Sequence, residues 1–129
     1  MAKMHVLVCV TGQRTCERLI KTGAELTGGA AGSLSVVHVA RPGQRFLGSE
    51  DEASALEYLY QVSRDYGADM ALMRSDDVCG AIADAARKRN SAVVLLGAPK
   101  GNAKGMQLPA LLRAQLPGVD VREIITSGD

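Results

Sequence analysis

The stretch Ala92-Val93-Val94-Leu95-Leu96-Gly97 contains five consecutive apolar residues and ends at a glycine. A continuous apolar run, rather than an alternating one, is typical of a strand buried on both faces of a parallel sheet. Residues 4–10 and 34–39 have the same character. We therefore expect a parallel sheet with helices packed on both of its faces.

Segments with helical spacing separate these strands. Apolar residues recur every three or four positions over residues 16–26, 55–66, 78–85 and 108–116. A weaker strand is expected at 69–73, and an alternating edge strand with one solvated face at 119–125. The alternation of strands and helices predicts right-handed crossovers and a doubly wound α/β sheet in a single domain over residues 1–129.

Several residues mark where these helices begin, end and face the core. Ser49 and Glu52 have the spacing of a capping box, and Asp76 or Asp77 can cap the third helix. Asn90 is a plausible left-handed stop. The last helix is expected to turn four residues inward, namely Leu108, Leu111, Leu112 and Leu116.

Composition excludes several classes of protein. The chain has 129 residues, of which 47% are hydrophobic and 22% charged, and a formal net charge of +1. This balance is globular, and it argues against a large nucleic-acid footprint, which needs clustered basic residues. No run approaches the roughly 18 apolar residues of a membrane span, and no signal peptide is visible. Cys9 and Cys16 fall in apolar patterns, which predicts reduced core thiols and a cytoplasmic protein.

The loop at residues 97–105 is the most informative candidate site. In doubly wound sheets, ligands bind outside the carboxyl ends of the strands. The loop has three glycines and two lysines, and a helix begins after it, so it could hold a phosphate. An ordinary crossover loop is the alternative. Thr11 and Gly12 follow the first strand and could meet an anion, although a simple strand-to-helix turn explains them as well.

Other reactive side chains have no partners at useful spacing. His5 and His38 lie in predicted strands without nearby carboxylates or thiols, so core or edge positions suit them better than metal binding. Helix capping explains Asp76 and Asp77. No nucleophile and base can be paired from spacing alone, so we expect no catalytic residue, no metal site and no enzymatic activity.

The strands and the first helix resemble those of universal stress proteins. The resemblance is carried by Val6-Leu7-Val8-Cys9-Val10, Cys16-Glu17-Arg18-Leu19-Ile20, Leu34-Ser35-Val36-Val37-His38-Val39 and Val93-Val94-Leu95-Leu96-Gly97. It covers almost the whole chain and is strongest to the stress-protein domain of potassium-sensor histidine kinases. It implies a Rossmann-like sheet of order 3-2-1-4-5 and a homodimer formed through the last strand.

The resemblance also implies a nucleotide site, but with altered residues. Gly97 matches the first glycine of the family's ATP loop, whereas Lys100 stands where the second glycine is expected. Met106 follows Gly105 in place of Ser or Thr, and Thr11 replaces an Asp at the end of the first strand. We therefore expect weak binding of ATP, AMP or cyclic di-AMP, or none. The residues expected to contact such a nucleotide are Thr11, Gly12, Val39, Gly97, Lys100, Gly101 and Gly105.

Three functions follow from these patterns. The first is a stress-response or signalling module that binds an adenine nucleotide weakly. The second is a protein-interaction domain without a small-molecule ligand. The third is an FMN-binding, flavodoxin-like carrier, since Thr11-Gly12 and Thr15 resemble a flavin phosphate loop. Flavin rings usually rest on aromatic side chains, and the only tyrosines, Tyr58, Tyr60 and Tyr66, fall on one predicted helix.

Overall fold

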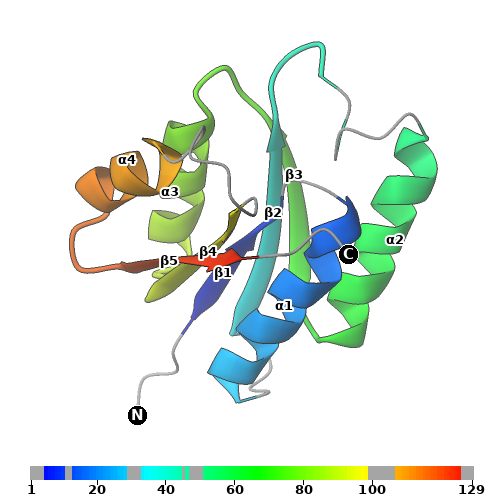
Figure 1. Ribbon diagram of the computed structural model, residues 1–129, viewed down its shortest axis with the longest axis horizontal. Helices are drawn as coiled ribbons and strands as arrows, with labels where there is room; N and C mark the ends of the chain where they lie inside the picture. Colours follow the sequence, from blue (N-terminus) through cyan, green and yellow to red (C-terminus); the bar gives the residue numbers. More distant parts are fainter. Residues whose placement is uncertain are drawn as a thin grey trace.

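A computed structural model shows five strands and four helices that alternate along the chain (Figure 1). It describes residues 5–10, 13–28, 33–44, 46, 51–98 and 107–125. The strands are β1 (Val6–Cys9), β2 (Leu34–Ala40), β3 (Asp69–Arg74), β4 (Val93–Ala98) and β5 (Asp120–Ile125). The helices are α1 (Gln13–Thr27), α2 (Glu52–Asp65), α3 (Val78–Lys88) and α4 (Gln107–Gln115).

The five strands form one parallel sheet in the order β3-β2-β1-β4-β5. The predicted fold class and strand order are therefore confirmed. Strand β1 lies in the centre, where Val6, Leu7 and Val8 are fully buried. A central strand has helices on both faces, which is why its apolar run is continuous rather than alternating.

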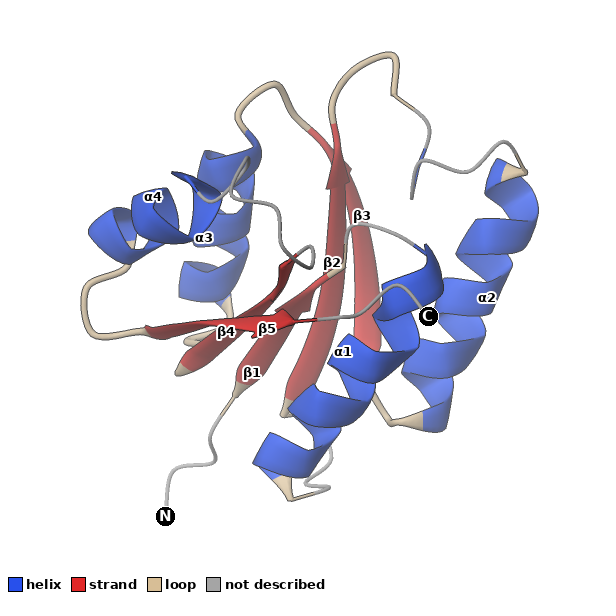
Figure 2. Ribbon diagram, viewed as in Figure 1, coloured by secondary structure: helices blue, strands red, loops and turns tan. Residues whose placement is uncertain are grey.

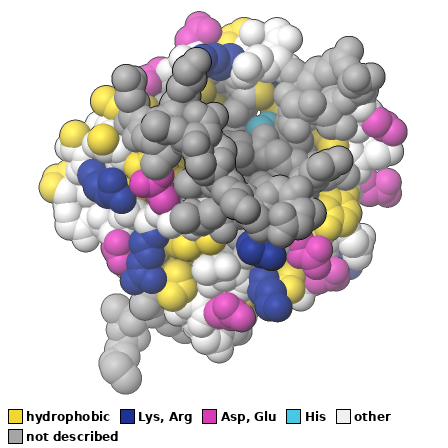
Figure 3. Space-filling model, in the orientation of Figure 1, with side chains coloured by type: hydrophobic (Ala, Val, Ile, Leu, Met, Phe, Trp, Pro, Cys, Tyr) yellow, Lys and Arg dark blue, Asp and Glu magenta, His cyan; other side chains and the backbone are white. Residues whose placement is uncertain are grey.

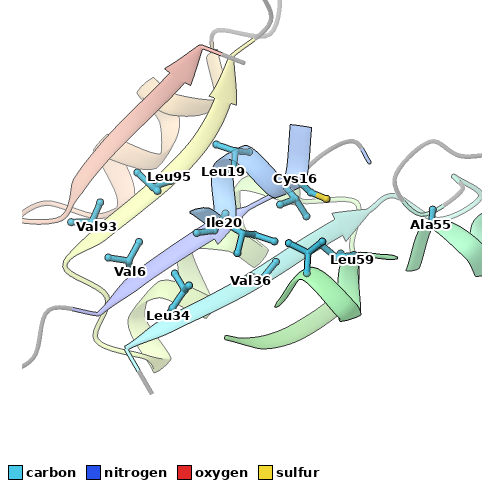
Figure 4. Packing of buried hydrophobic residues seen from close by; sticks show 13 residues of the cluster. Val6, Cys16, Leu19, Ile20, Leu34, Val36, Ala55, Leu59, Val93 and Leu95 are labelled. Carbon is cyan, nitrogen blue, oxygen red and sulfur yellow. The ribbon is translucent and has the colours of Figure 1, made fainter. Parts of the chain in front are cut away.

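Helices α1 and α2 cover one face of the sheet, and α3 and α4 cover the other (Figure 2). Side chains alternate along each strand, so Val6 and Val8 pack against α1 while Leu7 and Cys9 join the cluster with α3 and α4. Figure 4 shows the first cluster, in which Ile20 lies above strand residues such as Val36. Both cores are almost entirely aliphatic.

Helix α1 lies unusually close to the sheet at Gly23. A Cβ atom added there would lie 2.7 Å from Cγ2 of Val8 and 2.8 Å from Cδ1 of Leu34. Real Cβ atoms essentially never come so close to other atoms. The glycine is therefore required by the approach of the helix rather than by its own backbone conformation.

The helix caps confirm one prediction and correct another. Asp77 caps α3, accepting a hydrogen bond of 2.9 Å from the backbone N–H of Gly80, and Asn90 has the left-handed φ of 51°. The N-cap of α2, however, is Asp51 and not Ser49, because the Asp51 carboxylate accepts from the N–H of Ser54 at 3.2 Å. Ser49 itself lies outside the described residues.

The predicted inward face of α4 is wrong at one position. Leu112 and Leu116 are buried and Leu108 packs against the same cluster, but Leu111 is 51% exposed. Residues 108, 112 and 116 follow one another at intervals of four and share one stripe. Leu111 lies about 100° around the helix from Leu112, which places it outside that stripe. The three-or-four-residue spacing of apolar positions includes Leu111, but its side chain does not face the core.

Candidate functional site

Strands β1, β2 and β4 end at the same edge of the sheet. Cys9 pairs with Val37 on one side and with Leu96 on the other, so Val10, His38 and Gly97 follow at one level. The crossovers change direction between β1 and β4, which makes this the switch point where doubly wound folds bind ligands. Helix α1 begins at Gln13, shortly after β1, and its positive dipole end lies at this edge. The predicted convergence of strand ends is confirmed for the described residues.

The structure places only two of the seven predicted site residues. Val39 lies near the end of β2, and Gly97 lies in β4, where it pairs with Ile124. Because β1 separates β2 from β4, the two residues are roughly 10 Å apart in the hydrogen-bonding direction. The remaining five predictions lie outside the described residues, namely Thr11, Gly12, Lys100, Gly101 and Gly105.

A small apolar cavity lies beneath this edge. It has a volume of about 30 Å³ and is lined by side chains that include Val39, Cys9, Leu96 and Leu108. A cavity of that size and character cannot hold an adenine ring, and it offers no hydrogen bonds. Burial also raises the pKa of the Cys9 thiol to about 12, so the thiol is neither a nucleophile nor a ready metal ligand. These residues give the sheet an apolar, chemically unreactive surface beneath its carboxyl edge.

His38 lies between Val37 and Val39 in β2, so its side chain points to the opposite face of the sheet from the cavity. Its Nδ1 lies 2.8 Å from the carbonyl oxygen of Val10. A carbonyl can only accept, so the proton of the neutral ring is on Nδ1 and Nε2 is an acceptor. Burial lowers the pKa of His38, the hydrogen bond with Val10 opposes this effect and Arg74 adds to it, so the pKa lies below its usual value and the ring is neutral at pH 7. The predicted core position is confirmed, but the sequence did not indicate that this histidine lies beside the candidate site.

Arg74, the last residue of β3, holds the loop that follows β2. Its Nη1 donates to the carbonyl oxygens of Gln44 at 2.8 Å and Arg41 at 3.3 Å. Its guanidinium lies 4.2 Å from the centre of the Phe46 ring, and its Nη2 lies 3.7 Å from the Glu52 carboxylate. Sequence reasoning missed this arrangement, because the contacting residues are far apart along the chain and no motif joins them.

The predicted capping role of Glu52 is replaced by a different contact. Its carboxylate accepts a hydrogen bond of 2.7 Å from the backbone N–H of Phe46. The Phe46 ring in turn lies edge-on to His38, with ring centroids 5.7 Å apart. Loop residue, helix residue and strand residue are thus connected at the carboxyl end of β2 and β3.

The remaining predictions about site chemistry can be compared with the described residues only. Among them, no group of three or more His, Cys, Asp or Glu side chains could hold a metal ion, and no helix is long and apolar enough to cross a membrane. Basic and acidic side chains are interspersed on the face shown in Figure 3. That pattern agrees with the near-neutral net charge, and the described residues of this face form no patch of one sign.

The tyrosines do not support a flavin site. The hydroxyl of Tyr58 donates to the Glu17 carboxylate on α1 at 3.0 Å, and Tyr60 is exposed on α2. Helix α2 packs against α1 and β3, not beside the switch point between β1 and β4. None of the three tyrosines, which all lie on or at the end of α2, is therefore placed where an isoalloxazine ring would rest.

Comparison with solved structures shows the same fold in universal stress proteins. No protein-family model matches the sequence, and no curated protein shows significant similarity to it. A universal stress protein in complex with cAMP has a TM-score of 0.63 and 17% identity, over 98% of this chain and all of the other. The universal stress protein of Archaeoglobus fulgidus in complex with dAMP has a TM-score of 0.57 and 15% identity, over 96% and 99% of the two chains.

A second structure of the Archaeoglobus fulgidus protein gives a TM-score of 0.60 with 18% identity, over 94% of this chain and 93% of the other. Identities this low establish a shared architecture and no more. Each alignment nevertheless spans nearly the whole of both chains. The arrangement of all nine helices and strands is thus that of a universal stress protein.

Proposed function

We propose that this protein is a universal stress protein-like signalling module that binds an adenine nucleotide weakly at the carboxyl edge of its sheet. The observation that carries the proposal is the strand register, which brings the ends of β1, β2 and β4 together at the switch point. Proteins of the same architecture have been solved with cAMP and with dAMP. We further propose that it acts in the cytoplasm and binds the nucleotide without turning it over, like the stress-protein domain of sensor kinases that its sequence resembles.

The described residues favour recognition of an uncharged, flat group at this edge. Val39 and Leu96 supply apolar surface. An adenine ring has an apolar face that suits such a surface. Phosphate binding would fall to the loops that contain Thr11, Gly12, Lys100, Gly101 and Gly105. The departures of those loops from the ATP pattern are the reason for proposing weak affinity.

Calorimetric titration tests the ligand part of this proposal. We expect binding of ATP, AMP, cyclic AMP or cyclic di-AMP, with dissociation constants no tighter than about 10 μM. The Gly97→Val variant adds a β-branched side chain, a type favoured in strands, at the carboxyl edge and should weaken binding at least tenfold. Ala92→Val, just before the amino end of β4, is the matched control. No binding of any of the four at millimolar concentration would refute the nucleotide site and leave the fold unaffected.

Dimerisation through β5 is part of the proposal, and the structure makes it specific. The N–H of Asp120 bonds towards β4, so the carbonyl of Val121 points to the outer edge of the sheet. Arg113 of α4 already donates to that carbonyl at 2.9 Å. A partner strand must therefore displace Arg113 or pair further along, near Glu123. Light scattering should show a dimer, and Arg113→Ala should not weaken it; a monomer at 100 μM would contradict this part.

One observation favours the second candidate, a protein-interaction domain. Leu72 is 37% exposed on β3, the other edge strand of the sheet. An exposed leucine on an edge strand is suited to strand addition by a partner protein. A partner recovered from cell extract by the wild type and lost by Leu72→Lys, together with no nucleotide binding, would favour this function over the first.

A further inference from the structure

A chain of hydrogen-bonded side chains crosses the amino edge of the sheet, opposite the candidate nucleotide site. His5 precedes β1, and its Nδ1 lies 2.8 Å from Oγ of Ser91, which precedes β4. The other ring nitrogen, Nε2, lies 3.0 Å from Oγ of Ser35 in β2. Ser35 Oγ lies 2.6 Å from Oδ1 of Asp69, the first residue of β3. Figure 2 shows the amino ends of β1, β2 and β4 along one side of the sheet.

The direction of this chain follows from its last member. A carboxylate can only accept, so Ser35 donates its hydroxyl proton to Asp69, over a distance typical of a strong charge-assisted bond. The Ser35 oxygen is then the acceptor for Nε2–H of His5. A neutral imidazole carries one proton, so Nδ1 holds a lone pair and accepts the hydroxyl proton of Ser91. Asp69 thereby determines, through Ser35, which nitrogen of His5 carries the proton.

This is the arrangement of a serine polarised by a base. Nucleophile and base lie within the 2.6–3.2 Å that proton transfer requires, and the base is oriented by a third group. Burial lowers the pKa of His5; Asp69 of β3 opposes this effect, and Arg89 at the end of α3 adds to it. The ring is therefore unprotonated and able to accept a proton at pH 7. Ser91 and Ser35 are both nearly inaccessible, at 5% and 2% exposure, so bulk water competes little for these bonds.

Ser91 also borders a hollow that can admit a small molecule. The hollow has a volume of about 370 Å³, within the range of small-molecule sites. Its lining combines polar residues, among them Asn90 and Arg87, with the apolar residues Leu116, Pro117 and Val119. The amide group of Asn90 can donate a hydrogen bond to a developing oxyanion. The apolar part of the lining suits a short acyl chain.

We propose that Ser91 is a nucleophile that accepts an acyl group from a small activated ester, with His5 as its general base and Asp69 as a positioning residue that acts through Ser35. In the acylation step, Oγ of Ser91 attacks the carbonyl carbon while its proton moves to Nδ1 of His5. The tetrahedral intermediate then expels the alcohol, which takes the proton from Nδ1. The products are acyl-Ser91, the free alcohol and neutral His5. This site is separate from the nucleotide site and does not depend on it.

Labelling of the whole protein with a small alkyl fluorophosphonate tests the proposal. Such a reagent phosphonylates serines polarised by a base and releases fluoride, leaving a stable adduct that peptide mass spectrometry can locate. We expect the adduct on Ser91 and not on Ser63, a serine equally buried whose hydroxyl donates to the carbonyl of Leu59 at 2.8 Å. An adduct on other residues only, or none, would overturn the proposal without any variant being made.

Variants separate catalysis by His5 from a structural role. His5→Gln retains hydrogen-bonding groups but cannot take up a proton at pH 7, and it should slow labelling of Ser91 by about 10²–10⁴-fold. Asp69→Asn should slow it less and move the pH at which labelling is half maximal. Ser63→Ala is the matched control and should label normally. Circular dichroism shows whether the His5→Gln variant is folded. The proposal is refuted if Ser91 of the folded variant is labelled as fast as in the wild type. It is also refuted if the wild-type labelling rate does not rise with pH as His5 loses its proton.

Discussion

Replacing Gly23 with alanine sets two effects of opposite sign against each other. In a helix interior, alanine is favoured over glycine by about 1 kcal/mol, because it loses less backbone entropy on folding. At this position, however, the new methyl group would lie 2.7 Å from Cγ2 of Val8 and 2.8 Å from Cδ1 of Leu34. Carbon atoms prefer separations of about 3.5–4.0 Å, so both contacts are strongly repulsive.

The surroundings decide which effect is larger. Val8 is fully buried in the central strand and Leu34 is nearly so, and valine is stiff about χ1, so neither side chain can move without disturbing the core. Extra methyl groups in a well-packed core cost about 1–3 kcal/mol. Subtracting the helix-propensity gain leaves an expected loss of about 1 kcal/mol in the free energy of unfolding.

Urea unfolding of the variant, followed by circular dichroism, measures this loss. Lys21→Ala, on the exposed side of the same helix, should change the free energy of unfolding by less than about 0.5 kcal/mol and serves as the control. In the Val8→Ala background one of the two clashes is absent, so Gly23→Ala should there be less harmful by about 1 kcal/mol. If Gly23→Ala stabilises the wild type, or if the two substitutions are additive, helix α1 does not lie as close to the sheet as the structure indicates.

Three further predictions follow from the caps and the buried groups. Asp77→Ala removes the N-cap of α3 and should cost about 1 kcal/mol in the free energy of unfolding, whereas Asp76→Ala, one residue earlier, should cost less than half of that. Burial holds the pKa of His5 and of His38 below 6.5, so the unfolded chain binds more protons than the folded one in this range. Stability to urea should therefore be constant above about pH 7 and fall as the pH drops below 6.5 through the folded-state pKa values; equal stability at pH 5.5 and 7.5 would contradict the buried positions. The Cys9 thiol has a pKa of about 12, so at pH 8 it should react with a thiol reagent at least about 100-fold more slowly in the native than in the urea-unfolded protein. Rapid labelling of Cys9 in the native protein would show that the strand is accessible.

Periodicity along the chain was sufficient for the fold class, whereas the strand order was implied by the resemblance to universal stress proteins. The continuous apolar runs around Val8 and Leu95 could only be buried on both faces, and helical spacing between them required crossovers, so a parallel sheet was the one arrangement that satisfied both patterns. Neighbouring residues alone indicated Asp76 or Asp77 as the cap of the third helix and Asn90 as its stop, and the structure selects Asp77 as the cap. The Ser49 cap was wrong because Asp51 meets the same local requirement closer to the helix.

What the sequence determined, then, is most of what depends on contacts within a few residues or on burial repeated at a regular period, with the Ser49 cap and the inward position of Leu111 as exceptions. The tertiary structure alone decided which distant side chains meet. Arg74 contacts the loop after β2, and Ser91, His5, Ser35 and Asp69 form one directed chain, although 86 residues separate its first two members. The physical reason is that the partners of such hydrogen bonds have no regular spacing along the sequence. Strand order and register bring them together, and neither can be read from a single residue.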